Sequence, residues 1–135
     1  MAAELKRFNL ICGDEQYLKE KKKKELLKAL HTEGSMNFNA FEGKYLDRDE
    51  VLRLGNTMPF LSDRRTILLT DSGLFRGAVP EAFLEELSAL PESTVLIFYE
   101  GETEAGNRLY KFVKEKGEVF RYQKAESLSF KEAAQ

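Results

Sequence analysis

The sequence predicts an α/β domain in which a five-stranded parallel sheet lies between two layers of helices. The prediction rests on a repeated alternation of short apolar segments with longer helical segments, which is typical of parallel sheets. Two of the segments, TILLT and TVLIFY, are apolar at almost every position, as expected for strands that helices cover on both faces. No internal repeat interrupts this alternation.

Five segments have the character of strands. The segment NFNAFE alternates between polar and apolar residues, which predicts a strand at the edge of the sheet. The first segment is interpreted as a buried strand that runs through a glycine turn into a helix. Strands are expected at residues 7–12, 37–42, 66–70, 94–99 and 118–122.

Helices are expected between the strands, and several carry start signals. Asp47 has the chemistry of an N-cap, with Glu50 three residues later, and Pro80 fits the first turn of another helix. That third helix has one apolar face, made of Phe83, Leu84, Leu87 and Leu90. The helices are expected at residues 15–32, 47–57, 79–90 and 105–116, and a last one near residue 129.

The length predicts one domain, which we place at residues 1–126. Ser129 and Glu132 have capping-box spacing, which indicates a helix that starts just before the sequence stops. We therefore expect residues 127–135 to begin a truncated connection to a following domain.

The composition excludes several classes of protein. No apolar run approaches the roughly 18 residues of a membrane helix, and the first residues lack the apolar core of a signal peptide. Cys12 is the only cysteine, so no internal disulfide can form, and a reducing cytoplasm is expected. The net charge of -2 gives no strong attraction to nucleic acid or anionic lipid.

Catalytic chemistry is also not expected. With His31 as the only histidine, no metal site or catalytic cluster can be built on imidazole. Cys12 is interpreted as a small buried hydrophobic residue rather than a nucleophile. The serines lie singly in turns, without a base beside them, so neither a hydrolase triad nor a cofactor is predicted.

The first strand runs into a turn, GDEQYLKE, that resembles a phosphate-binding loop. Against the pattern G-x-x-x-x-G-K-[ST], Gly13 and Lys19 match. Leu18 replaces the glycine that lets backbone amides close around a phosphate, and Glu20 replaces the hydroxyl that reaches magnesium. Two further carboxylates in the turn would repel an anion. We expect a degraded loop that binds no nucleotide; a weak nucleotide-binding domain is a third interpretation.

A phospho-receiver signalling domain is the main alternative. Asp14 and Glu15 after the first strand, Asp71 as acceptor after the third, and Lys124 after the fifth fit the acidic pocket of such domains. Against it, Glu100 ends the fourth strand where a small hydroxyl residue is expected, and no proline follows the lysine.

Asp71 has a simpler interpretation as well. An aspartate after the apolar strand could hold magnesium, as in phosphate-loop hydrolases. Without a phosphate site, we favour a structural residue that accepts turn hydrogen bonds from the amides of Ser72 and Gly73.

The first helix is rich in lysine, which allows two interpretations. A basic DNA-facing patch should form a one-sided stripe, whereas six lysines in this window are expected to circle the helix. We therefore favour a solvated helix face. The residues are Lys19, Lys21, Lys22, Lys23, Lys24 and Lys28.

Two large apolar residues, Phe60 and Leu61, follow Pro59 between the second helix and the third strand. Taken alone, such residues in a turn are more often folded into the core than exposed.

Three segments in this order resemble a known family. They are GDEQYLKE after the first strand, MPFLSDRR before the third, and TVLIFYEG followed by a helix that contains Leu109, Tyr110 and Lys111. Together they span residues 7–123, and their order and spacing resemble the N-terminal domain of the delta subunit of bacterial DNA polymerase III, a component of the clamp loader.

The resemblance implies an AAA+-like domain without a functional phosphate loop. Such a domain is no ATPase itself but belongs to a holoenzyme that is a DNA-directed DNA polymerase, a nucleotidyltransferase. Its implied partners are the sliding clamp (beta subunit), the tau/gamma and delta-prime subunits, and primer–template DNA through the assembled complex. By resemblance, Phe60 and Leu61 enter a hydrophobic pocket on the clamp and help open the ring, with Thr57 and Met58 beside them.

Overall fold

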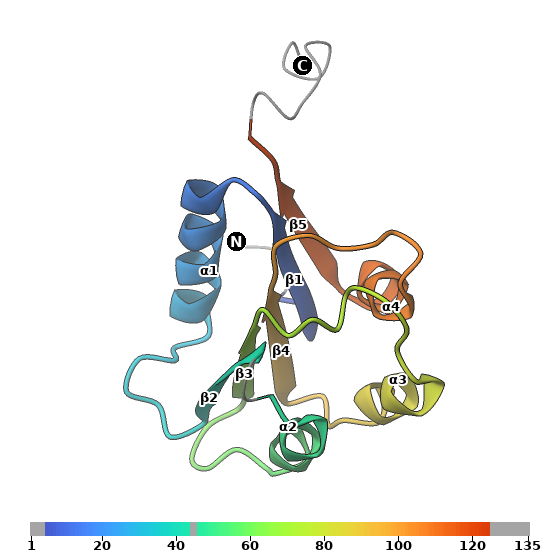
Figure 1. Ribbon diagram of the computed structural model, residues 1–135. Helices are drawn as coiled ribbons and strands as arrows, with labels where there is room; N and C mark the ends of the chain where they lie inside the picture. Colours follow the sequence, from blue (N-terminus) through green and yellow to red (C-terminus); the bar gives the residue numbers. More distant parts are fainter. Residues whose placement is uncertain (1–4, 44–45, 125–135) are drawn as a thin grey trace.

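The computed structural model describes residues 5–43 and 46–124 (Figure 1). All five predicted strands and the four helices between them are confirmed, although the helices are shorter than expected. The predicted boundary after residue 126 and the helix near residue 129 lie outside the described residues. The elements are β1 (Phe8–Gly13), α1 (Gln16–Ala29), β2 (Phe38–Glu42), α2 (Arg48–Gly55), β3 (Arg65–Thr70), α3 (Glu81–Ser88), β4 (Thr94–Tyr99), α4 (Arg108–Lys116) and β5 (Glu118–Tyr122).

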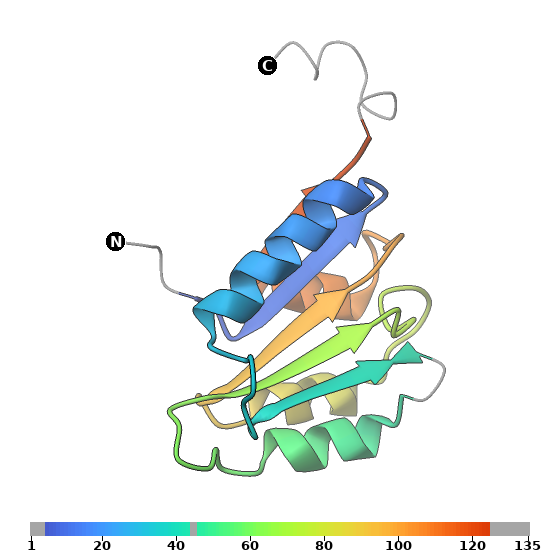
Figure 2. The same ribbon diagram turned by 90° about the vertical axis from the view of Figure 1, so that its left-hand side faces the viewer.

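The strands form one parallel sheet in the order β2-β3-β4-β1-β5. β1, β3 and β4 are buried along nearly their whole length, because neighbouring strands flank them and helices cover their faces. β2 lies at the edge, as its alternating pattern predicted, and Figure 2 shows it beside β3.

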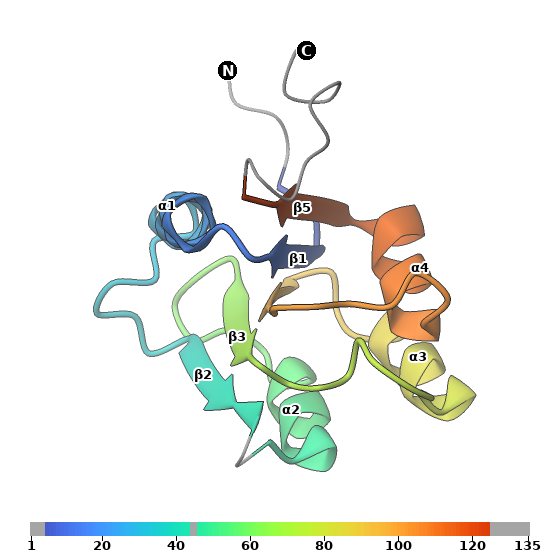
Figure 3. The same cartoon turned by 45° about the horizontal axis from the view of Figure 1, so that its top comes forward.

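Helices cover both faces of the sheet, which confirms the predicted three-layer architecture. Among the described residues, α1 is the helix on one face, whereas α2, α3 and α4 lie on the other (Figures 1 and 3). Right-handed crossovers explain this division. The chain passes from β1 to the far edge at β2 and then returns in the opposite direction, so the later helices lie on the opposite face.

Two apolar clusters hold the layers together. The larger one joins the sheet to α2, α3 and α4 and includes Leu10, Leu96 and Phe98. The smaller one joins the sheet to α1 through Leu26 and Leu30. Each strand contributes alternate residues to the two clusters, which is the period of two expected of a strand.

The helix starts follow the predicted chemistry in part. The Asp47 carboxylate accepts a hydrogen bond from the Asp49 amide, as expected of an N-cap. Glu50 pairs with Arg53 along the same helix. Pro80 is the residue just before α3 rather than part of its first turn. The predicted apolar face is confirmed: Phe83 and Leu87 of α3 are buried, Leu84 is partly buried, and Leu90, just beyond the helix, is buried too.

Candidate functional site

A loop of residues 56–64 connects α2 to β3 and presents apolar side chains to solvent. Met58 is 67% exposed, Phe60 is 56% exposed and Leu61 is 89% exposed, and Thr57 beside them is exposed too. The interpretation of Phe60 and Leu61 as core residues, which the residues alone favoured, is therefore wrong. Large aliphatic and aromatic side chains grouped in one loop mark a candidate surface for binding another protein.

The loop backbone is held by Asn37, a buried residue just before β2. The Asn37 Nδ2 atom donates to the Phe60 carbonyl oxygen at 2.8 Å, and the Phe60 amide donates to the Asn37 Oδ1 atom at 2.7 Å. This two-way pairing satisfies both main-chain groups of Phe60. The backbone under the phenyl ring is thus fixed while the ring stays in solvent.

Arg65, the first residue of β3, holds the other half of the loop. Its buried guanidinium donates to the carbonyl oxygen of Thr57 at 2.9 Å and to that of Met58 at 3.3 Å. A third hydrogen bond, 3.1 Å long, reaches the Asn39 Oδ1 atom in β2. The planar guanidinium thereby joins the loop to the edge of the sheet.

The loop adopts one strained conformation that these contacts support. Leu61 has a φ of 56°, a left-handed conformation that costs a residue with a side chain about 1 to 3 kcal/mol and persists where neighbouring contacts fix it. Such a loop loses little conformational freedom when a partner binds.

Neither Asn37 nor Arg65 was expected at this site from the sequence. One feature of the sequence could have pointed to Arg65: it is a charged residue at the start of a strand that is apolar on both faces. Met36 was missed as well: it is 74% exposed and precedes Asn37, whose side chain contacts the loop.

The turn after β1, which resembles a phosphate-binding loop in sequence, lies beyond the carboxyl ends of the strands, whereas the 56–64 loop precedes β3. Gly13 has a φ of 111°, and a Cβ atom there would lie 1.9 Å from the Tyr122 carbonyl oxygen. Its amide donates to the Gly101 carbonyl oxygen at 3.0 Å, and the Glu15 amide donates to that of Tyr122 at 3.1 Å. Both amides are therefore engaged with neighbouring strand ends.

Lys19 is buried, which contradicts its expected place on a solvated helix face. Its Nζ atom donates to the carbonyl oxygens of Gly13 at 3.0 Å and Glu100 at 2.6 Å and lies 4.7 Å from the centre of the Tyr99 ring. Burial lowers the pKa of this amino group. The lysine of the phosphate-loop pattern thus holds the turn against β4.

The two residues that break the pattern have other roles. The Glu20 carboxylate accepts a hydrogen bond from the Tyr99 hydroxyl at 2.7 Å and pairs with Lys23 at 3.4 Å. The hydrogen bond from Tyr99 lowers the pKa of Glu20. Leu18 is partly exposed on the first turn of α1.

Glu100, at the end of β4, performs the role expected of Asp71. It accepts hydrogen bonds from the Ser72 amide at 3.1 Å and the Ser72 hydroxyl at 2.7 Å, and the Gly73 amide also bonds to it. The expectation that Asp71 accepts these bonds is wrong. Burial raises the pKa of Glu100 despite these donors.

The strand order contradicts the phospho-receiver alternative. Receiver domains have the order 2-1-3-4-5, which places the first and third strands side by side. Here β4 lies between β1 and β3, so it separates the strand ends that carry Asp14 and Asp71. The contact between Lys124 and Asp14 is made by the backbone of Lys124: its main-chain amide donates to the Asp14 Oδ1 atom at 2.8 Å.

Residues 5–43 and 46–124 contain no group of three or more potential metal ligands among His, Cys, Asp and Glu, and no helix long and apolar enough to cross a membrane. Cys12 is buried, as predicted, and burial raises the pKa of its thiol.

The chain matches a known protein family over most of its length. The family model for DNA polymerase III, delta subunit, matches residues 9–123. The chain belongs to this delta subunit family. No curated protein matches the chain.

Two solved structures share the fold of this family member. The Bacillus subtilis DNA clamp loader delta protein is similar with a TM-score of 0.78 at 16% identity, over 96% of this chain and 41% of that one. A DNA polymerase III, gamma subunit-related protein from Thermotoga maritima has a TM-score of 0.52 at 19% identity, over 87% of this chain and 40% of that one. The chain thus spans about two fifths of each structure.

Proposed function

We propose that this chain is the clamp-contacting domain of a clamp-loader delta subunit, and that the 56–64 loop binds the sliding clamp. One observation carries the proposal: Phe60 and Leu61 are exposed on a backbone that Asn37 and Arg65 hold in place. Family membership supports it, and so does the fold shared with the B. subtilis clamp loader delta protein.

The chemistry of the loop fits a small protein-binding anchor. A phenyl ring and a leucine side chain that leave water for an apolar pocket can each contribute about 2 kcal/mol or more when they lie at the centre of an interface. Because the backbone is already ordered, little of this gain is lost to ordering. Thr57 and Met58 border the pair, and we add exposed Met36 as a further contact.

Clamp opening by this domain would need no nucleotide hydrolysis. A loop that binds an open or strained ring better than a closed one shifts the ring toward opening by that difference in affinity alone. The domain would serve within the DNA polymerase III holoenzyme, a DNA-directed DNA polymerase, in the cytoplasm. Its further partners would be the tau/gamma and delta-prime subunits, with primer–template DNA reached through the assembled complex.

The turn after β1 supports a domain that does not bind ATP. Lys19 is bonded to two main-chain carbonyl groups, and the amides of Gly13 and Glu15 are bonded to neighbouring strand ends. Leu18 and Glu20 occupy the positions of the closing glycine and the magnesium-binding hydroxyl. A phosphate group would therefore find neither a cradle nor a counter-charge.

The test is a titration of this chain with purified sliding clamp, in which surface plasmon resonance measures the binding. The proposal predicts saturable binding, whereas a receiver domain or a nucleotide-binding domain predicts none. Absence of binding at concentrations at which the whole delta subunit binds would contradict the proposed role of the loop.

Nucleotide binding is tested separately by thermal unfolding. A ligand that binds only the folded state raises the melting temperature as its concentration exceeds its dissociation constant. We expect no shift with magnesium and millimolar ATP. A magnesium-dependent rise would show that the turn after β1 still binds nucleotide.

A further inference from the structure

Positive charge is concentrated on α1. The helix carries six lysines and two glutamates, while the whole chain has a net charge of -2. Three of the lysines are used internally. Lys19 is buried under the turn after β1, Lys22 pairs with Glu25 at 2.9 Å, and Lys23 pairs with Glu20 at 3.4 Å. Both glutamates of the helix are therefore already paired.

The other three lysines form a one-sided stripe. Lys21, Lys24 and Lys28 are exposed, and within residues 5–43 and 46–124 no hydrogen bond or ion pair engages their amino groups. Their spacing of three and four residues places them along one face of the helix. Tyr17, which is 71% exposed, lies four residues before Lys21 and extends the same face. We call these four residues the α1 stripe.

The six lysines circle α1, as expected, but they are not equivalent. Lys19 is buried, and the amino groups of Lys22 and Lys23 lie 4.7 Å from the centres of the Phe120 and Tyr99 rings. The three exposed lysines, Lys21, Lys24 and Lys28, lie along one face, and a surface that follows a phosphate backbone requires such a one-sided arrangement.

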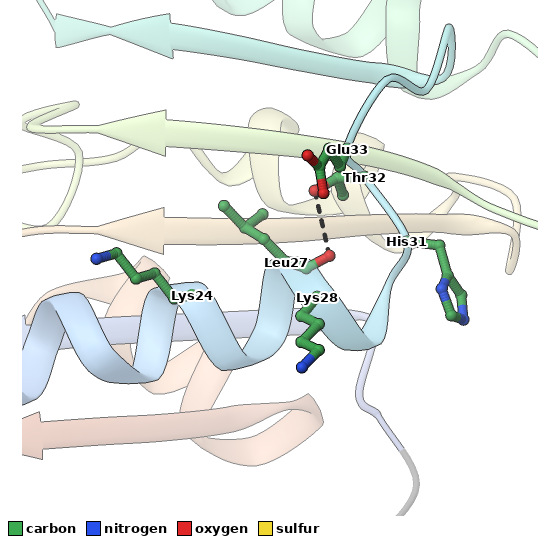
Figure 4. A pocket seen from close by; sticks show the side chains of 6 residues that line it. All are labelled: Lys24, Leu27, Lys28, His31, Thr32 and Glu33. Carbon is green, nitrogen blue, oxygen red and sulfur yellow. Dashed lines mark hydrogen bonds between the residues drawn. The ribbon is translucent and has the colours of Figure 1, made fainter.

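A hollow lies at the C-terminal end of the stripe. Its volume is about 580 Å³, and Leu27, Lys28 and His31 are among its lining residues. Figure 4 shows the side chains of Lys28 and His31 leaving the end of α1 on one side, while Glu33 lies on the other.

We propose that the α1 stripe binds the phosphate backbone of single-stranded DNA directly, independently of its sequence. Lysine amino groups attract phosphates as point charges, and an exposed tyrosine ring in line with them offers a face on which a base can stack. Lysine is depleted at protein–protein interfaces, which argues against a protein partner for this face. The inference goes beyond the proposed function, since the stripe lies on α1 and the clamp-binding loop lies between α2 and β3.

The test compares two variants of equal charge. Lys21→Gln/Lys24→Gln/Lys28→Gln removes the stripe, and glutamine keeps a similar helix propensity. Lys111→Gln/Lys114→Gln/Lys116→Gln removes three exposed lysines from α4, where Glu115 lies among them. Binding of a fluorescently labelled single-stranded oligonucleotide is measured by anisotropy between about 50 and 200 mM salt.

The stripe variant should bind at least about tenfold more weakly at low salt, and its logarithmic salt slope should shrink by about 2, from three lost phosphate contacts on a single strand. The α4 variant should stay within about threefold of the parent, since its lysines form no such stripe. Tyr17→Ala should weaken binding about fivefold or more through lost stacking. Phe60→Ala/Leu61→Ala should bind DNA normally even if clamp binding is lost.

Three outcomes would overturn the inference. Equal losses in both lysine variants would show attraction by net charge alone. Binding to duplex but not to single strands, with Tyr17→Ala unaffected, would assign the stripe to another nucleic acid. Stripe-dependent binding of poly-glutamate that exceeds binding of the oligonucleotide would assign it to an acidic protein.

Discussion

At the scale of single residues, two buried polar side chains hold the 56–64 loop by hydrogen bonds to its backbone. Asn37 and Arg65 make no part of the exposed surface, yet between them they bond to the main chain of Thr57, Met58 and Phe60. The proposed binding surface therefore depends on two residues that would not touch a partner.

Asn37→Ala tests this dependence. The change leaves the Phe60 amide and carbonyl without partners, so the free energy of unfolding should fall by about 1 to 3 kcal/mol. The Phe60 amide should exchange its hydrogen faster, and clamp affinity should fall although Phe60 and Leu61 are still present. Nuclear magnetic resonance exchange and clamp titration measure both effects. Unchanged exchange at Phe60 would show that other contacts order the loop.

Glu100 gives a prediction about pH. Burial raises its pKa in the folded state above the value of 4.5 in the unfolded chain, so its protonated form stabilises the fold below about pH 4.5 and this stabilisation is lost as the pH rises through the raised pKa. Glu100→Gln removes the titration and keeps an acceptor for Ser72.

Urea unfolding at several pH values measures the effect. The stability of Glu100→Gln relative to the parent should increase from about pH 4 to about pH 7, because only the parent acquires a buried charge in this range. A constant difference across the range would mean that Glu100 titrates in the folded protein as it does in the unfolded chain.

At the scale of elements, the periodicity of the sequence predicted the strands well but not their order. A strand that is buried on both faces has the same apolar pattern in any central position, so the segments alone fitted both a receiver domain and the observed sheet. The difference lies in the crossovers. Placing β1 between β4 and β5 sets Gly13 against Tyr122 and gives the turn after β1 its shape.

Gly13→Ala tests how strictly this packing constrains the turn. A Cβ atom would lie 1.9 Å from the Tyr122 carbonyl oxygen, so β1 and β5 would have to separate. Gly73→Ala is the matched control, because its φ of 76° is also left-handed but nothing lies within 4 Å of an added Cβ atom. The control should lose about 1 to 2 kcal/mol and Gly13→Ala clearly more, by thermal or urea unfolding. Equal losses would show that β5 yields easily.

At the scale of the whole molecule, the 56–64 loop and the turn after β1 lie at opposite ends of the strands of one sheet. Nucleotide sites of open α/β sheets lie beyond the carboxyl ends of the strands, where the turn after β1 is found. The 56–64 loop precedes β3 and is held by Asn37, which precedes β2. The loop therefore lies at the amino ends of the strands. A change in the turn after β1 would therefore leave the apolar 56–64 loop at the other end of the strands unaffected.

The sequence predicted the fold class, the five strands and the edge position of β2. It could not predict where Lys19 points, because the helix period alone does not show that the turn after β1 offers two carbonyl oxygens to a buried amino group. Nor could it decide whether Phe60 faces solvent. The Phe60 backbone pairs with Asn37, 23 residues away in the chain, and such pairings appear only in the folded structure.

The central claim is that Phe60 and Leu61 are exposed anchors for the sliding clamp. The most direct test measures clamp affinity and melting temperature together for Phe60→Ala, Leu61→Ala and the double variant, with Leu18→Ala as an exposed apolar control on α1. Clamp affinity should fall at least about thirtyfold for each loop residue, whereas stability should change by no more than about 0.5 kcal/mol. The control should keep full affinity. A large loss of melting temperature with unchanged affinity of the folded fraction would contradict the claim.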